Sequence, residues 1–93
     1  MERRTIRIIV HGRVQGVGYR AWLAKRAARF GLNGWVRNRS DGTVEAVLSG
    51  PAPDVDNAIA ASRQGPRAAD VSRIETDTYD EVVTDGFKTR PTV

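Results

Sequence analysis

The sequence contains no cysteine and only one histidine, His11. Without cysteine the chain can form no disulfide, no thiolate-ligated metal site and no cysteine nucleophile. A single histidine also leaves no basis for a paired-histidine metal site or a Ser-His-Asp triad. We therefore interpret His11 as a residue of the sheet surface and not as a catalytic base.

Long hydrophobic runs are absent as well. No stretch approaches the ~20 apolar residues of a membrane-spanning helix. The segment MERRTIRIIV has an acidic second residue and too few apolar residues for a signal peptide. We expect a cytoplasmic protein without membrane association. At 93 residues and 40% hydrophobic content, residues 1–93 are predicted to form a single domain with one core.

The charge is unevenly distributed along the chain. The net charge is +4, but residues 1–40 carry +9 and residues 41–93 carry −5. The first part of the chain should therefore attract anions, either a small phosphorylated molecule or the backbone of a nucleic acid. Composition alone does not distinguish these two partners.

The apolar pattern of the first half predicts a strand, a helix and a hairpin. Residues 5–11 alternate with a period of two, which is typical of a strand. From Tyr19 to Phe30 the apolar residues share one helical face, and Gly31 supplies a stop signal. Strands over 34–38 and 43–48 are predicted to be joined by a turn at Asp41-Gly42.

The second half predicts a helix and two further strands. Asp54 or a neighbour is expected to cap the helix, which Gly65-Pro66 ends. Residues 71–79 predict a strand with an irregular start, and residues 87–90 predict an edge strand. This order indicates an α+β, ferredoxin-like (βαββαβ) fold, with two helices on one face of a four- to five-stranded antiparallel sheet and the first strand central. Three aromatic residues are predicted to lie in the core: Trp22, Trp35 and Phe87.

The glycine-rich segment between the first strand and the first helix is a candidate anion site. Gly16 and Gly18 allow the backbone to bend with its N–H groups turned inward, and the helix dipole adds positive charge at the same point. Arg20 can add two parallel donors that match phosphate oxygens. Neither glycine-rich nucleotide fingerprint fits, so a small phosphoryl group is favoured. On local pattern alone, a simple glycine turn with a solvated Arg20 remains an equal alternative.

A second set of residues carries a family resemblance. The segments Gly12-Arg13-Val14-Gln15-Gly16-Val17-Gly18-Tyr19-Arg20, Gly34-Trp35-Val36-Arg37-Asn38 and Asp41-Gly42-x-Val44-Glu45-Ala46 together resemble the acylphosphatase family. Gln64-Gly65-Pro66 and Phe87-x-x-Arg90-Pro91 are also similar to family features. Tyr19 stands where phenylalanine is common in the family. The resemblance extends over nearly the whole chain.

The resemblance implies hydrolysis of the carboxyl–phosphate bond of small acyl phosphates, without metal or cofactor. It implies that Arg20 and Asn38 are the catalytic residues. The implied phosphate cradle is the backbone of Gln15, Gly16, Val17, Gly18, Tyr19 and Arg20. An acyl phosphate has a good leaving group, so neutralising the phosphoryl charge and aligning water can suffice. Asn38 cannot take up a proton, and the substrate phosphate or solvent is expected to do so. Taken alone, Asn38 would be an ordinary residue at the start of a turn.

Two other functions remain as alternatives. The basic first half fits a nucleic-acid-binding module, but no aromatic RNA-binding strand motif is present, so no nucleic acid is expected. A phosphate-sensing domain without turnover is the other alternative. The acidic residues near the end lack the spacing of a calcium-binding loop, so no metal is assigned to Asp77, Asp80, Glu81 and Asp85. The protein is expected to act as a monomer.

Overall fold

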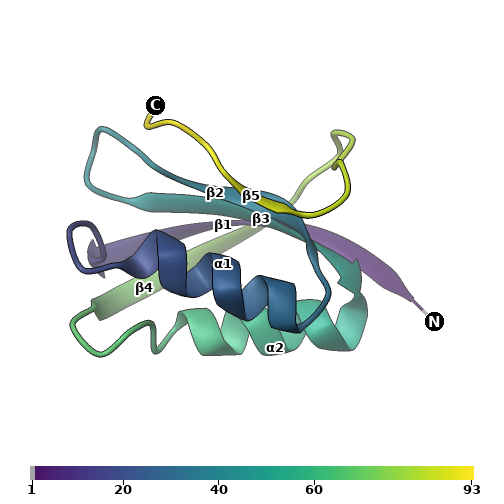
Figure 1. Ribbon diagram of the computed structural model, residues 1–93, viewed down its shortest axis with the longest axis horizontal. Coiled ribbons are helices and arrows are strands. Elements are labelled where there is room, and N and C mark those ends of the chain that lie inside the picture. The colour runs from purple at the N-terminus through teal and green to yellow at the C-terminus, as the bar shows by residue number, and fades with distance from the viewer. Residues whose placement is uncertain (1) are drawn as a thin grey trace.

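The computed structural model describes residues 2–93. Its elements follow the predicted order and are β1 (Arg3–Arg13), α1 (Tyr19–Arg29), β2 (Asn33–Asn38), β3 (Val44–Pro51), α2 (Ala52–Ser62), β4 (Asp70–Thr78) and β5 (Phe87–Thr89). Both helices lie on the same face of the sheet (Figure 1). This confirms the α+β, ferredoxin-like prediction.

Within the described residues the sheet has five strands in the order β4-β1-β3-β2-β5. The pairs β1–β3, β1–β4 and β2–β3 are antiparallel, whereas β2 and β5 are parallel. The expectation of a wholly antiparallel sheet is therefore wrong at its last strand. The last residue of β4 and the first residue of β2 lie at the same end of the strands. The chain therefore enters β5 from that end and runs parallel to β2. Because β5 extends the sheet beyond β2, the middle strand is β3, and β1 is an interior strand beside it.

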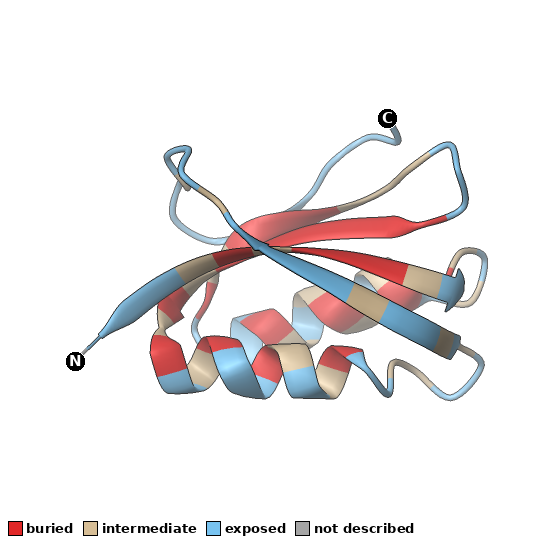
Figure 2. Cartoon of the chain, turned by 180° about the vertical axis from the view of Figure 1, so that it is seen from behind, coloured by how far each residue is buried: buried red, intermediate tan, exposed pale blue. Residues whose placement is uncertain are grey.

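The residues turned toward the helices form the main core. Ile8 and Val10 of β1, Val36 of β2 and Leu23 of α1 are fully buried in it. Figure 2 shows the buried residues concentrated in the inner strands and on the helix sides that face them. Trp22 and Phe87 pack against this core as partly buried residues. The pattern of period two in the strands and 3.6 in the helices thus predicted most of the interior.

Trp35 is buried but does not belong to the core between sheet and helices. It is 5% exposed and pairs with Val47 on the opposite face of the sheet. There its ring meets Tyr79 edge-on, and the guanidinium groups of Arg37 and Arg90 lie 4.7 and 4.5 Å from the ring centroid. The prediction that Trp35 is buried is confirmed. The structure adds which face of β2 its side chain covers, which burial alone does not reveal.

Two local predictions have different outcomes. The expected irregularity in the fourth strand is confirmed, since the β1–β4 register shifts between His11 and Gly12, opposite Arg73 and Val71. The expected cap of the second helix is wrong: α2 begins at Ala52 directly after β3, with Pro51 at the N-cap position and Asp54 in the first turn. Proline can stand at this point because the first helical turn needs no intrahelical N–H donor.

Candidate active site

The segment between β1 and α1 has the backbone geometry of an anion-binding bend. Gly16 and Gly18 have φ angles of 73° and 80°, which are in the left-handed region that glycine adopts without strain. Gly18 is the N-cap of α1 and contributes no side-chain cap. Among residues 2–93, no carbonyl accepts a hydrogen bond from the N–H groups of residues 15–21. These free donors and the helix dipole together favour a negatively charged group.

Buried side chains anchor this bend at both ends. Val14 is 2% exposed and Tyr19 is 1% exposed, and both belong to the main core. The Tyr19 hydroxyl donates a hydrogen bond of 2.7 Å to the carbonyl of Ser62 at the end of α2. Burial raises the pKa of the Tyr19 phenol to about 12. The bend is therefore held in place by packing, while its glycines remain at the surface.

A pocket of about 320 Å³ opens over the bend and brings the predicted catalytic residues together. It is lined by Val14, Gln15, Gly16, Gly18, Tyr19, Arg20, Ala21, Asn38 and Thr89. Of the predicted site residues only Val17 is not part of the lining, because its side chain packs against the core. Thr89, from β5, is a lining residue that the sequence did not reveal, since β5 reaches the pocket only through the parallel pairing with β2.

Asn38 closes the pocket from the end of β2. Its Oδ1 atom is buried and has no hydrogen-bond partner among the described residues. A buried acceptor without a donor is costly, so a hydrogen-bond donor brought to this amide would be favoured. Asn38 thus offers an unpaired acceptor at the pocket that it lines together with the bend.

The turn after Asn38 is tied to the bend by one side chain. Gln15 Nε2 donates hydrogen bonds of 2.8 Å to the carbonyls of both Arg39 and Thr43. Within the turn, Asp41 Oδ1 accepts from the backbone N–H and the hydroxyl of Thr43, and these hydrogen bonds lower the pKa of Asp41. No sequence pattern predicts the Gln15 contact, because its partners are backbone carbonyls 24 and 28 residues away.

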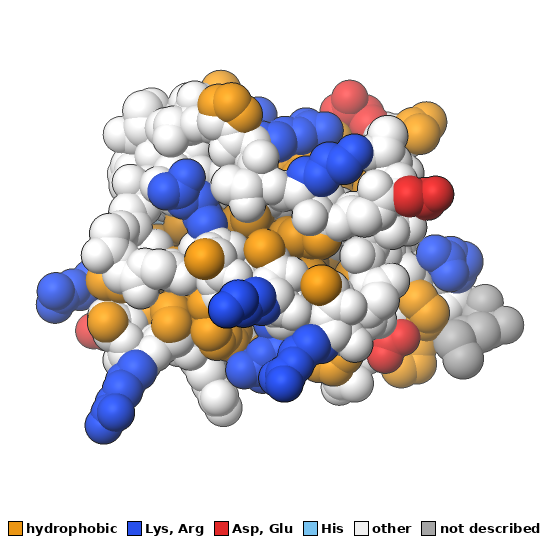
Figure 3. Space-filling view, in the orientation of Figure 1, with side chains coloured by type: hydrophobic (Ala, Val, Ile, Leu, Met, Phe, Trp, Pro, Cys, Tyr) orange, Lys and Arg blue, Asp and Glu red, His pale blue; other side chains and the backbone are white. Residues whose placement is uncertain are grey.

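Of the described residues that line the pocket, Arg20 alone carries a charge. In residues 2–93, no acidic side chain forms an ion pair with Arg20. Figure 3, which views the α1 side of the molecule, shows more lysine and arginine than acidic side chains on this face. An anionic ligand can therefore bind Arg20 without displacing an internal partner.

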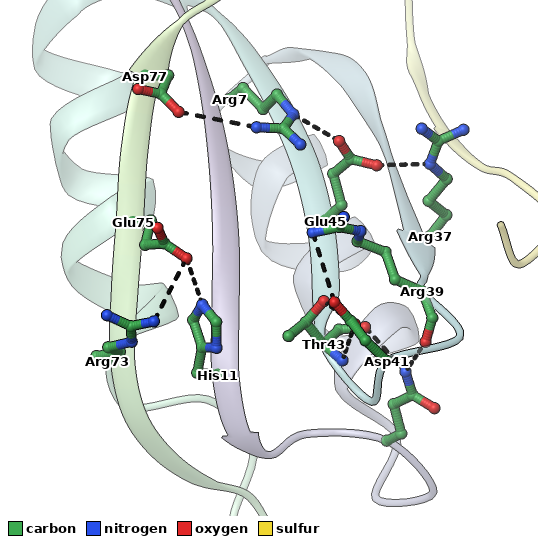
Figure 4. A network of polar contacts seen from close by, with 11 residues as sticks. Arg7, His11, Arg37, Arg39, Asp41, Thr43, Glu45, Arg73, Glu75 and Asp77 are labelled. Carbon is green, nitrogen blue, oxygen red and sulfur yellow. Dashed lines mark hydrogen bonds and ion pairs between the residues drawn. The ribbon is translucent and has the colours of Figure 1, made fainter.

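Most of the paired charges lie instead on the face of the sheet away from the helices (Figure 4). Glu45, 4% exposed, accepts from Arg7 Nε at 2.5 Å and from Arg37 Nε at 2.7 Å. Burial alone would raise the pKa of Glu45, but the hydrogen bonds from the two arginines outweigh it and leave the pKa below its usual range. His11, predicted at the sheet surface, lies 2.5 Å from Glu75 in the same layer and is not among the residues that line the pocket.

Among the described residues, α1 and α2 each have 11 residues, and neither could span a membrane. No cluster of three or more His, Cys, Asp or Glu side chains could hold a metal ion in residues 2–93, and this includes the acidic residues between 77 and 85.

Comparison with known proteins identifies a family for this arrangement. The acylphosphatase family matches residues 6–89. The chain is 50% identical over 92 residues to an acylphosphatase of Rhizorhabdus wittichii, a match that covers 99% of this chain and 93% of the relative. It is 52% identical over 93 residues to acylphosphatase 2 of Ralstonia nicotianae, covering 97% and 98% of the two chains. The crystal structure of acylphosphatase from Bacillus subtilis superimposes with a TM-score of 0.87 at 34% identity, covering 92% of this chain and 97% of that one.

These matches agree with the phosphate-directed geometry of the bend and with the fold. They extend over the segments on both sides of the pocket, from β1 through β5. The chain therefore belongs to the acylphosphatase family, and its activity is hydrolysis of the carboxyl–phosphate bond of small acyl phosphates.

Proposed function

We propose that Arg20 and the backbone N–H groups of residues 15–20 bind the phosphoryl group of the acyl phosphate. This proposal is supported by three features: residues of the bend line the same pocket as Arg20, their N–H groups have no carbonyl partner, and α1 begins at this point. Arginine can bind two phosphoryl oxygens at once, and its charge offsets the negative charge that the oxygens carry in the transition state. The cradle thus both holds the substrate and stabilises the reacting group.

Asn38 has a different role in this proposal, which is to orient the attacking water. Its carboxamide can accept a hydrogen bond from water through Oδ1 and donate another through Nδ2. Asn38 lines the same pocket as the bend, and in this proposal it holds a water on the side of the phosphorus opposite the carboxylate leaving group. Because the water and the phosphoryl group are then both bound in position, the reaction becomes effectively unimolecular.

The proton of the attacking water goes to a phosphoryl oxygen of the substrate or to solvent. No side chain that lines the pocket is a general base near neutral pH, since the lining contains no His, Asp, Glu or Lys. Water adds to phosphorus as the bond to the carboxylate oxygen breaks, giving the carboxylate and inorganic phosphate. The carboxylate is a weak base and leaves without protonation, so the proposal needs neither a metal nor a cofactor.

The observation that carries this proposal is the shared pocket. The free amides of the bend, an arginine without an acidic partner and a buried carboxamide oxygen without a donor all meet in it. Without a ligand in the pocket, the unpaired buried oxygen would cost free energy, and the free amides and Arg20 would have no partner to bind. An anion with a water beside it satisfies all three.

Steady-state hydrolysis of benzoyl phosphate, measured with EDTA present, tests the proposal. We expect turnover by the wild type and inhibition by inorganic phosphate. Asn38→Ala should lower kcat by about 10²–10³ and leave the inhibition constant of phosphate nearly unchanged. Arg20→Ala should lower kcat/KM by more than this and also weaken phosphate inhibition, because Arg20 contacts the ground state as well.

Two variants of the same residue types serve as controls. Arg29→Ala removes an exposed arginine from the same helix, and Asn33→Ala removes an asparagine from the same strand, and neither residue lines the pocket. Both should retain the kinetics of the wild type. Full activity of Asn38→Ala, or an unchanged KM and unchanged phosphate inhibition in Arg20→Ala, would contradict the assigned roles. Loss of wild-type turnover in EDTA would contradict metal independence.

The remaining features of the proposal concern organisation and location. Residues 1–93 act as a single acylphosphatase-like domain, and the family match to residues 6–89 supports this. The protein acts as a monomer, since one chain supplies the whole lining of the pocket. It binds no nucleic acid, because acidic partners already pair with Arg7, Arg37 and Arg73 on the sheet face. It works in the cytoplasm, because its substrate is a charged molecule that a membrane retains.

A further inference from the structure

We propose that the side chain of Gln15 is a positioning residue for hydrolysis, which fixes the distance between Asn38 and the phosphate cradle. The inference rests on the proposed roles of Asn38 and the cradle. It concerns the carboxamide of Gln15, whereas the cradle uses only the backbone of this residue. Its basis is the pair of hydrogen bonds that joins the bend to the turn after β2.

Both hydrogens of the Gln15 amide are engaged by this connection. Nε2 carries two N–H donors, and it has two acceptors at 2.8 Å, the carbonyls of Arg39 and Thr43. No donor is left on the side chain for a phosphoryl group, and its Oε1 atom would repel one. Gln15 therefore acts on the reaction through the residues that it holds and not by contact with the substrate.

The turn does not need Gln15 for its own closure. Arg39 N–H donates to the carbonyl of Thr43 at 2.9 Å, and Gly42 N–H donates to the carbonyl of Arg39 at 3.1 Å. Each carbonyl that Gln15 reaches thus already accepts a backbone hydrogen bond. What Gln15 adds is the link between this turn, which directly follows Asn38, and the bend.

The bend, for its part, keeps its shape without the Gln15 side chain. Val14 and Tyr19, on either side, are 2% and 1% exposed and are anchored in the core. Removing the amide should therefore leave both the cradle and the turn intact and free only their relative position. A misplacement of about 1 Å in a reacting group can cost about 10²-fold in rate.

The test combines Gln15→Met with Asn38→Ala. Methionine has nearly the volume of glutamine but cannot donate, and it avoids the negative charge that Gln15→Glu would place beside the phosphate. For Gln15→Met we expect kcat for benzoyl phosphate to fall by about 10- to 100-fold, with KM and phosphate inhibition close to those of the wild type. A role in stability alone would lower the melting temperature and leave the kcat of the folded protein unchanged.

The double variant shows whether Gln15 works through Asn38. If it does, Gln15→Met should have little further effect on the residual rate of Asn38→Ala, measured at high enzyme concentration. Losses that multiply in the double variant would overturn the inference, as would a kcat of Gln15→Met equal to that of the wild type. If the residual rate of Asn38→Ala is too low to measure, the separation of kcat from KM in the single variant decides.

Asn33→Ala provides a matched control. The Asn33 carboxamide also ties two distant segments, accepting from Gly86 N–H at 2.9 Å, but it lies outside the pocket lining. We expect this variant to lose stability and retain kcat. The two proposals can fail separately. Full activity of Asn38→Ala would contradict both of them. Wild-type kcat in Gln15→Met, with a low kcat in Asn38→Ala, would contradict only the Gln15 inference.

Discussion

The backbone N–H of Val93 donates a hydrogen bond of 3.2 Å to the carbonyl of Asn38. The carbonyl of Val93 in turn accepts from Ser40 N–H at 2.8 Å, and Arg90 N–H donates to the carbonyl of Val36 at 2.9 Å. The segment after β5 therefore continues alongside β2 to the point where Asn38 enters the pocket. The turn after Asn38 is thus held by Gln15 of the bend and by Val93 of the segment after β5.

Deleting Thr92 and Val93 should loosen this end of β2. The deletion removes two hydrogen bonds, and we expect the free energy of unfolding to fall by about 1–3 kcal/mol. kcat for benzoyl phosphate should decrease more than KM changes, because Asn38 moves while the cradle stays in place. Urea unfolding and steady-state kinetics measure the two effects.

Val93→Ala is the control for this deletion. The Val93 side chain is 59% exposed and the contacts are made by its backbone, so the substitution should change neither stability nor kcat. A truncated protein with the kcat of the wild type would show that the Val93 contacts do not position Asn38.

Stability should depend on pH through Glu45. Its pKa is lower in the folded protein than the ordinary value of 4.5, because the hydrogen bonds from Arg37 and Arg7 outweigh the effect of burial. A group with a lowered folded pKa stabilises the protein above its unfolded pKa, and this contribution is lost as the pH falls through the folded pKa. The Glu45 contribution is therefore complete at neutral pH and declines below about pH 4.5.

Glu45→Gln isolates this effect. We expect the variant to be less stable than the wild type by about 1–3 kcal/mol at pH 7, since charge-assisted hydrogen bonds to a buried group are lost. The difference should shrink as the pH is lowered toward 3. A difference that is constant from pH 7 to pH 3 would mean that the charge of Glu45 contributes nothing. Urea unfolding at several pH values provides the measurement.

The hydroxyl of Tyr19 should contribute to stability by joining the two helices. Tyr19→Phe would leave the buried carbonyl of Ser62 without this donor, and we expect a loss of about 1–3 kcal/mol in urea unfolding at pH 7. The folded pKa of about 12 exceeds the ordinary value of 10.0, so the contribution is complete below pH 10 and is lost as the pH rises toward 12. The stabilities of the two proteins should therefore converge in strong alkali. Equal stability at pH 7 would contradict the contribution.

Two glycines should differ in their tolerance of alanine. Gly18 has a φ of 80° but open space around an added Cβ, so Gly18→Ala should cost only the strain of the left-handed backbone, about 1–2 kcal/mol. At Gly34 an added Cβ would lie 1.8 Å from the carbonyl oxygen of Val47, and φ is 140°. Gly34→Ala should therefore be clearly more destabilising in thermal or urea unfolding. The reverse order would show that β2 can move away from β3 without cost.

Much of the fold follows from patterns between near neighbours. The alternation in β1, the single apolar face of α1 and the Asp41-Gly42 turn each depend on residues a few positions apart, and the structure confirms all three. The first residue of α2 does not follow from local sequence patterns, because it depends on where β3 ends. Pro51 belongs to both the strand and the helix cap, so no side-chain capping signal marks the boundary.

Local sequence patterns are enough to predict the bend and the order of the elements. Glycines at 16 and 18 permit the left-handed backbone, and the apolar spacing from Tyr19 onward begins a helix there. These properties are local, because backbone sterics and side-chain periodicity act over a few residues.

Which side chains meet in the pocket depends on long-range packing and not on local patterns. The parallel pairing of β5 sets Thr89 opposite Val36 and brings it into the pocket that Asn38 also lines. Gln15 bonds to the turn after β2, and Val93 bonds to Asn38 itself. These contacts join segments far apart in the chain, and two of them use backbone groups that every residue carries. Their partners are fixed by the register and packing of the whole sheet, which no local pattern records.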